Sequence, residues 1–196
     1  MRNDRLLFER LDLRIAAGQM LVVEGPNGCG KTSLLRILTG LRLADGGSVL
    51  WRDQPIDQLG GDYYEQVNYV GHHDGVKREL DCLENLRLAR AMGVPSGLDL
   101  DDALDQVDLY AYGETPAGSL STGQKRRLAL ARLLVTEASL WVLDEPFTSL
   151  DRDSMALFSR LFEQHLQRDG LIVMTSHHEI SLPTQTVQRL RLGEAA

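Results

Sequence analysis

The 196-residue sequence predicts an α/β fold in which a parallel-sheet core carries an inserted α-helical subdomain. Three observations predict this fold. Apolar strand-like runs alternate with helical patterns toward both ends of the chain, a glycine-rich loop follows the first run, and the pattern from about residue 79 to 136 is helical. Such alternation is typical of a parallel sheet, because parallel strands are joined by helices. We therefore expect a single domain, with residues 1–72 and 137–196 as the parallel-sheet core and residues 73–136 as the helical subdomain.

Short apolar runs place the elements of the core. Strands are expected at residues 19–24, 48–51, 67–71, 139–143 and 171–175. Residues 31–40 predict a helix that ends at Gly40, since glycine commonly follows the last turn of a helix. A second core helix lies between the last two strands, where apolar residues recur at helical spacing; they are Met155, Phe158, Phe162 and Leu166.

Capping signals place the helices of the subdomain. Asp81 with Glu84, and Ser121 with Gln124, have the spacing of capping boxes, which open helices. The helix that begins after Ser121 is expected to run to about residue 136. Between these two helices, one apolar face comprises Leu100, Ala103, Leu104 and Val107.

Charge and composition exclude several functions. The formal net charge is −7, and no run of like charges forms a basic block. Nucleic-acid binding requires a basic stripe and adhesion to anionic membranes requires a polybasic segment, so we expect neither. No apolar run approaches the roughly 20 residues of a spanning helix, and the N-terminus carries no secretory signal. Cys29 and Cys82 lack metal-ligand or disulfide spacing, which indicates reduced, cytosolic thiols.

The glycine-rich loop predicts a nucleotide site. It matches GxxxxGK[ST] in full, between a predicted strand and a predicted helix. Backbone N–H groups of such a loop, with the helix N-terminus, cradle phosphates; Lys31 would reach the β- and γ-phosphates, and the Thr32 hydroxyl would bind Mg²⁺. The expected nucleotide-binding residues are Gly25, Pro26, Asn27, Gly28, Cys29, Gly30, Lys31, Thr32 and Ser33. Alone, this loop also fits kinases, GTPases and DNA-processing ATPases.

Two carboxylates end a later strand. Asp144 and Glu145 follow the apolar run 140–143. We expect Asp144 to hold Mg²⁺, directly or through water, and Glu145 to act as the general base that polarises the attacking water. A solvated acidic turn is the common alternative for a lone Asp-Glu pair. The presence of a phosphate loop in the same chain disfavours that alternative here.

A capped helix start completes the pattern. Residues 120–124 (LSTGQ) present N–H groups to an anion and resemble the LSGGQ signature of the ATP-binding subunits of ABC (ATP-binding cassette) transporters. Thr122 stands where that family usually has glycine, and the following residues 126–132 (RRLALAR) match as well. The resemblance covers nearly the whole chain, and it implies a single ABC ATPase domain of the P-loop NTPase fold over residues 1–196, with residues 1–72 and 137–196 as its nucleotide-binding core. It implies that Ser121, Thr122, Gly123 and Gln124 meet the γ-phosphate of ATP held by a second subunit, in a head-to-tail homodimer.

The same resemblance implies three further site residues. Asp151 matches the D-loop, which crosses the dimer interface, although it also has the character of a helix N-cap. His177 matches the switch histidine that contacts the γ-phosphate and orients the water. His72 stands where the family usually has a glutamine that senses Mg²⁺ and water, so we expect His72 to replace it.

The histidine at position 72 indicates a subfamily. Residues 71–80, 83–86, 46–51 and 140–148 resemble the haem-exporter ATP-binding subunits of cytochrome c maturation. This resemblance implies integral membrane subunits of a haem exporter as partners, ATP and Mg²⁺ as cofactors, and a peripheral position on the cytoplasmic face of the inner membrane. Because the membrane subunits read the cargo, an ABC ATPase for another cargo stays open, as does a soluble ABC-type ATPase of DNA repair or translation. A small-molecule kinase does not use the signature segment.

The sequence also supports smaller expectations about single residues and short segments. Adjacent histidines on a loop point apart, so neither His72-His73 nor His177-His178 is expected to bind metal or haem. Cys29 is expected either to be a reactive thiol whose alkylation blocks ATP binding or to be a buried, inert one. Phe8 is expected in the core rather than stacked on adenine, and residues 11–15 are expected to form a strand. The family's usual adenine-stacking strand would precede Met1, so we expect the native start codon to lie upstream.

Overall fold

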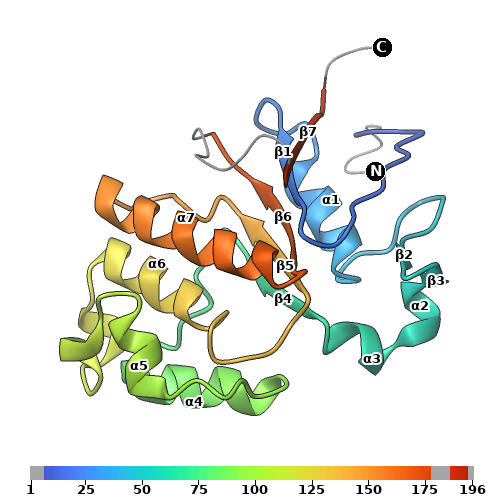
Figure 1. The fold of residues 1–196 in the computed structure, drawn as a ribbon. Coiled ribbons are helices and arrows are strands. Elements are labelled where there is room, and N and C mark those ends of the chain that lie inside the picture. The colour runs from blue at the N-terminus through green and yellow to red at the C-terminus, as the bar shows by residue number, and fades with distance from the viewer. Residues whose placement is uncertain (1–6, 178–185, 194–196) are drawn as a thin grey trace.

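The computed structural model describes residues 7–177 and 186–193 (Figure 1). Its main sheet has five strands in the order β4-β5-β6-β1-β7, and every pairing is parallel. These strands are β1 (Met20–Glu24), β4 (Val67–Val70), β5 (Leu140–Asp144), β6 (Leu171–Thr175) and β7 (Val187–Arg191). The predicted strand at 48–51 belongs instead to a small antiparallel pair, β2 (Leu50–Trp51) with β3 (Gln54–Pro55). The expected parallel core is therefore confirmed.

Helices surround this sheet and extend to one side of it (Figure 1). They are α1 (Lys31–Leu38), α2 (Ile56–Leu59), α3 (Gly61–Tyr64), α4 (Cys82–Met92), α5 (Leu100–Asp105), α6 (Thr122–Ala131) and α7 (Arg152–Gln167), with short 3₁₀ turns η1 (Tyr110–Tyr112) and η2 (Ala117–Ser119). Figure 1 shows α4, α5 and α6 grouped together, away from α1. All three fall between β4 and β5 in the sequence, which is where the inserted subdomain was expected.

Alternate strand residues enter two separate cores. Met20 and Val22 of β1 belong to a cluster with α7 and the helices of the insertion, whereas Leu21 and Val23 belong to a second cluster with α1. The predicted stripe on α7 supplies Phe158, Phe162 and Leu166 to the first cluster as buried residues and Met155 as a partly buried one. A parallel sheet covered on both faces requires such apolar strands. The carboxyl ends of β1, β5 and β6 are thereby fixed side by side.

The helix expected to run to about residue 136 is shorter. Both predicted capping boxes are present, but α6 ends at Ala131. The N–H groups of Leu133 and Leu134 bond three residues back rather than four, which tightens the chain into turns. Thr136 then forms an isolated β-bridge with Pro95. A competing tertiary pairing therefore ends the helix early.

The strand expected at residues 11–15 is wrong. Residues 7–16 form no strand in the structure. Leu11, Leu13 and Ile15 nevertheless pack against the second core cluster, as does Phe8, which was expected in the core. Arg10 has a φ of 52°, outside the extended region, so the backbone bends there. The alternating pattern reflects packing without a ladder of hydrogen bonds.

Candidate functional site

The phosphate loop joins β1 to α1 at the carboxyl edge of the sheet. Gly25, Gly28 and Gly30 all have positive φ, of 144°, 81° and 113°. A side chain at Gly25 would come within 2.3 Å of the Leu192 carbonyl oxygen, so glycine is required there, whereas Gly28 faces open space. Lys31 is buried and donates hydrogen bonds to the carbonyl oxygens of Gly25 (2.6 Å) and Pro26 (3.4 Å). The loop thus has the glycine conformations and the buried ammonium that a phosphate site requires.

The two predicted metal ligands meet. Thr32, in the first turn of α1, donates from Oγ1 to Oδ2 of Asp144 over 2.8 Å. The other carboxylate oxygen accepts a hydrogen bond from Thr175 Oγ1 at 2.7 Å, and Asp144 is only 3 % exposed. A hydroxyl and a carboxylate are oxygen ligands of the kind that Mg²⁺ prefers. These residues therefore fit a magnesium ion.

Glu145 and the predicted switch histidine also meet. Oε1 of Glu145 lies 3.2 Å from Nε2 of His177, and Oε2 accepts a hydrogen bond from Thr148 Oγ1 at 3.3 Å. Side-chain exposure is 27 % for Glu145 and 53 % for His177, so water reaches the pair. This carboxylate has the position and access that a base acting on water needs. His178, the second residue of that histidine pair, lies outside the described residues.

Among the described residues 7–177, His72 forms no hydrogen bond with this pair. It is exposed and its ring packs edge-on against that of His73, with centroids 5.8 Å apart. Within the described part of the chain, no hydrogen bond or ion pair joins His72 to Glu145 or His177. The structure therefore places His72 in the loop after β4 without a bond between its side chain and the base.

The signature segment lies beside the D-loop of its own chain. Ser121 Oγ accepts from the Gln124 N–H, and Gln124 Oε1 accepts from the Ser121 N–H, which closes the capping box. A side chain at Gly123 would come within 2.9 Å of the Ser149 carbonyl oxygen. Among the described residues, no hydrogen bond links the signature to the phosphate loop. Ser121 and Thr122 are exposed at the N-terminal end of α6.

Asp151 is the N-cap of α7, as one interpretation of the sequence predicted. Its Oδ1 accepts from the Ser154 N–H at 2.8 Å, and this hydrogen bond lowers the pKa of Asp151. The carboxylate is exposed, so the helix cap leaves it accessible to a second molecule.

Cys29 is buried rather than presented to solvent. Its Sγ lies under the loop, where a side chain added at Gly25 would come within 2.8 Å of it. A side chain at Gly193 would likewise approach its Cβ to 3.0 Å. This packing favours the inert thiol over the reactive one.

Two buried residues at this site were missed by sequence reasoning. Thr175 bonds both Asp144 and the Glu145 N–H, and Arg126 donates to carbonyl oxygens around both carboxylates. Arg126 and Thr175 each lie in a segment that resembles the family, but the resemblance implies no role for either residue. The sequence signal for them is therefore weak. Their partners come from other segments of the chain.

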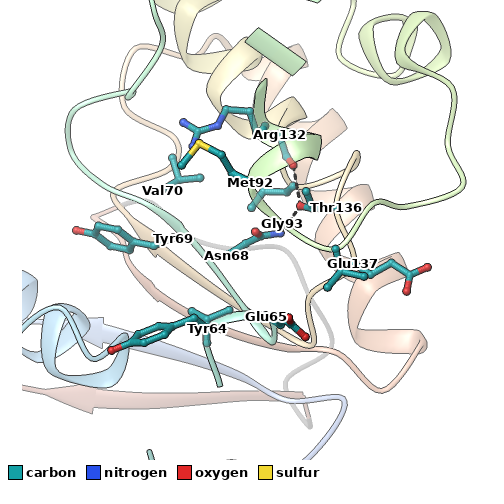
Figure 2. Close-up of a pocket in the computed structure, with 14 residues that line it drawn as sticks. Tyr64, Glu65, Asn68, Tyr69, Val70, Met92, Gly93, Arg132, Thr136 and Glu137 are labelled. Carbon is teal, nitrogen blue, oxygen red and sulfur yellow. Dashed lines mark hydrogen bonds between the residues drawn. The ribbon is translucent and has the colours of Figure 1, made fainter. Parts of the chain in front are cut away.

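A cavity of about 200 Å³ lies away from the nucleotide-binding loop (Figure 2). It opens between β4 and the C-terminal end of α4, with Tyr64, Asn68 and Met92 among its lining residues. Figure 2 shows the hydrogen bonds that join Asn68 to Thr136 and Thr136 to the carbonyl of Arg132. None of the predicted site residues lines this cavity. It lies where the sheet meets the inserted helices.

A protein-family model matches most of the chain. The ABC transporter model matches residues 8–148, which include the phosphate loop, the signature and both carboxylates. The chain belongs to the ABC transporter family, and it is an ATP-binding, ATP-hydrolysing subunit of that class.

The relatives place the chain more narrowly. It is 46 % identical over 197 residues to the cytochrome c biogenesis ATP-binding export protein CcmA of Nitrosospira multiformis, covering 98 % of this chain and 94 % of that protein. It is 47 % identical over 184 residues to the protein of the same name from Methylococcus capsulatus, covering 93 % and 89 %. Within the ABC transporters, the chain thus groups with the cytochrome c biogenesis ATP-binding export proteins.

A solved structure has the same fold. A putative ABC transporter ATP-binding protein from Pyrococcus furiosus superposes with a TM-score of 0.82 and 25 % identity, covering 95 % of this chain and 92 % of that one. Among the described residues, none of the helices is both long and apolar enough to cross a bilayer. The motor activity of an ABC transporter, ATP hydrolysis that drives a membrane partner, follows from the family.

Proposed function

We propose that this chain is the motor subunit of the haem exporter of cytochrome c biogenesis. The relatives that carry this proposal are named cytochrome c biogenesis ATP-binding export proteins, and they match the chain over nearly its whole length. Its partners would be the integral membrane subunits of that exporter, and its place the cytoplasmic face of the inner membrane. Residues 1–72 and 137–196 would work as the nucleotide-binding core and residues 73–136 as the helical subdomain.

Glu145 is the proposed general base. It takes a proton from the water that attacks the γ-phosphorus of ATP, as the bond to the β,γ-bridging oxygen breaks and ADP and phosphate form. The distance of 3.2 Å between Glu145 Oε1 and His177 Nε2 supports a role for that histidine in orienting the carboxylate and the water. The single observation that carries the mechanism is this contact at the end of β5, beside the Thr32–Asp144 hydrogen bond.

The phosphate loop and the proposed metal ligands hold the substrate. Residues 25–33 bind the phosphates, with Lys31 as the buried cation, while Thr32 and Asp144 are the ligands for magnesium. Held by Thr32 and Asp144, Mg²⁺ would supply positive charge against the phosphate oxygens. His72, in the loop after β4, is proposed to take the place of the family's glutamine once nucleotide is bound.

A second copy of the chain completes the site. Helix N-termini favour anions, and the exposed Ser121 and Thr122 lie at the N-terminus of a ten-residue helix. Among the described residues, no hydrogen bond joins this signature to the phosphate loop of its own chain. We therefore propose that residues 121–124 and Asp151 act across a head-to-tail homodimer that sandwiches two ATP molecules.

Complementation tests the cargo. The full chain is expressed in a bacterium that lacks its own cytochrome c biogenesis ATPase, and covalent haem in c-type cytochromes is measured by haem staining. We expect restored haem attachment, with recovery of the haem-exporter membrane subunits when the chain is purified from solubilised membranes. Glu145→Gln is the matched control and should restore nothing. An active ATPase that restores no haem attachment and recovers other membrane subunits would identify an ABC transporter for another cargo.

A further inference from the structure

The backbone of the proposed base is held in an uncommon conformation. Glu145 has a φ of 51°, in the left-handed region that residues other than glycine rarely adopt. Such conformations persist where surrounding groups over-determine them, and they gather at functional sites. The backbone N–H and the backbone carbonyl of Glu145 are held by two buried side chains from different elements.

Thr175 holds the amide side. Its Oγ1 accepts the hydrogen bond of the Glu145 N–H at 2.8 Å and donates its own proton to Asp144 Oδ1 at 2.7 Å. Thr175 is fully buried and is the register partner of Asp144 in the β5–β6 pairing. One hydroxyl therefore sets both the proposed base and the proposed magnesium ligand.

Arg126 holds the carbonyl side. It is 3 % exposed, and burial lowers its pKa while the nearby Asp74 carboxylate opposes that effect. A guanidinium has five N–H donors, and here each has an acceptor. The acceptors are the carbonyl oxygens of Pro146 (3.0 Å), Gly71 (2.9 Å), Asp144 (2.9 Å) and Glu145 (2.8 Å), and Oδ1 of Asp74 (3.3 Å).

The position of Arg126 joins three parts of the site. It lies on α6, the helix that the signature opens, three residues after Gly123. Its acceptors span the end of β5 and the loop that carries His72. Lysine could not reproduce this arrangement, because an ammonium is a compact group with three donors and lacks the planar fork.

We propose that Thr175 and Arg126 are positioning residues that hold the Glu145 backbone, one at its N–H and the other at its carbonyl, and that Arg126 ties the orientation of the signature helix to that of the base. Neither residue touches the reacting atoms. This inference rests on Glu145 being the base proposed above. Through Arg126, movement of α6 on docking of a second copy is then transmitted directly to the backbone of Glu145.

A purely structural role predicts a different result. If Arg126 and Thr175 only satisfy buried groups, their loss lowers the melting temperature and nucleotide binding along with turnover. A positioning role lowers kcat, while the Kd for ATP and the KM change little. The two roles are separated by kinetics on variants that stay folded.

The test uses four variants of the full chain. Thr175→Val keeps the shape of the side chain but removes the hydroxyl, and Thr175→Ser restores the hydroxyl. Arg126→Lys keeps the charge but loses the fork. Arg132→Lys is the matched control, because half-buried Arg132 follows the same helix and donates to the Asp74 carbonyl but to none of the carbonyls of residues 144–146.

We expect kcat to fall at least about tenfold in Thr175→Val and Arg126→Lys, a part of the 10²–10⁴ that a general base supplies. In both, the Kd for ATP should stay within about twofold of the parent, as for an interaction made in the transition state. Thr175→Ser and Arg132→Lys should keep most of the parent kcat. Parent-like kcat in folded Thr175→Val, or equal loss in Thr175→Ser, would overturn the proposal even if Glu145→Gln is inactive. An active Glu145→Gln would instead overturn the assignment of the base.

Discussion

The two ends of strand β5 bury polar side chains in opposite ways. At the carboxyl end, Asp144 is 3 % exposed and both of its carboxylate oxygens accept hydrogen bonds from hydroxyl groups. Three residues earlier, Trp141 is 5 % exposed and stacks on His165, with ring centroids 3.8 Å apart and an interplanar angle of 8°. Within the part of the chain that the structure describes, Trp141 Nε1 and His165 Nε2 have no hydrogen-bond partner. The two ends of β5 therefore differ in the pairing of their buried polar atoms and not in the extent of burial.

Loss of the base should have the largest effect at the catalytic end. Glu145→Gln removes the proton acceptor and keeps the size of the side chain, so turnover should fall about 10²–10⁴-fold while ATP binding persists. Steady-state hydrolysis and isothermal titration measure the two quantities, and gel filtration should detect an ATP-bound dimer. Parent-like hydrolysis by this variant would mean that Glu145 is not the base. The two ends of β5 would then no longer differ in catalytic role.

A bulky cation at the signature should stop turnover in a different way. Ser121→Arg obstructs the proposed dimer sandwich and disturbs the helix cap, so hydrolysis should fall to near background while the monomer binds nucleotide normally. Gln167→Arg, at the exposed C-terminus of α7, adds the same side chain away from the site and should stay active. Equal loss of nucleotide binding in Ser121→Arg would make the signature a structural segment.

The packed end of β5 should respond to acid. Burial lowers the pKa of His165 from 6.5 to about 4, so the folded chain keeps this ring neutral while the unfolded chain takes up a proton. The free energy of unfolding therefore has its full value above pH 6.5 and decreases progressively as the pH falls toward 4, by up to about 3 kcal/mol. His165→Phe keeps an aromatic ring against Trp141 and should flatten this loss in urea titrations from pH 7 to pH 4.5. An unchanged pH profile would assign the acid sensitivity to other groups.

The smallest effect concerns the buried thiols. Cys29 lies under the phosphate loop, and burial raises the pKa of Cys82 to about 11, so both should react slowly with N-ethylmaleimide in the folded chain. Mass spectrometry of peptides after timed labelling, with a urea-unfolded sample as the reference, measures each rate. Where Cys29 does react, ATP binding should be lost. Rapid labelling of Cys29 that bound MgATP prevents would restore the reactive-thiol interpretation.

The sequence predicted the parts of the site whose signals are local. The phosphate loop, the strand that ends at Asp144 and the cap at Ser121 each follow from a few neighbouring residues. The meeting of the loop with Asp144 follows from parallel strands whose carboxyl ends share one edge. β7 was not predicted, because this edge strand carries polar residues such as Gln188 and Arg189 and has no continuous apolar run. Arg126 could not be predicted either, since its acceptors come from two distant segments that only the fold brings together.

The close approach of Gly123 to Ser149 has a consequence for how the signature can vary. A methyl group at position 123 would press on the Ser149 carbonyl oxygen, and Ser149, with a φ of 66°, already has a restricted backbone. Thr122 is exposed at the first position of its helix. Within one subunit, position 122 therefore has room for a side chain, whereas a side chain at position 123 would meet the Ser149 carbonyl oxygen.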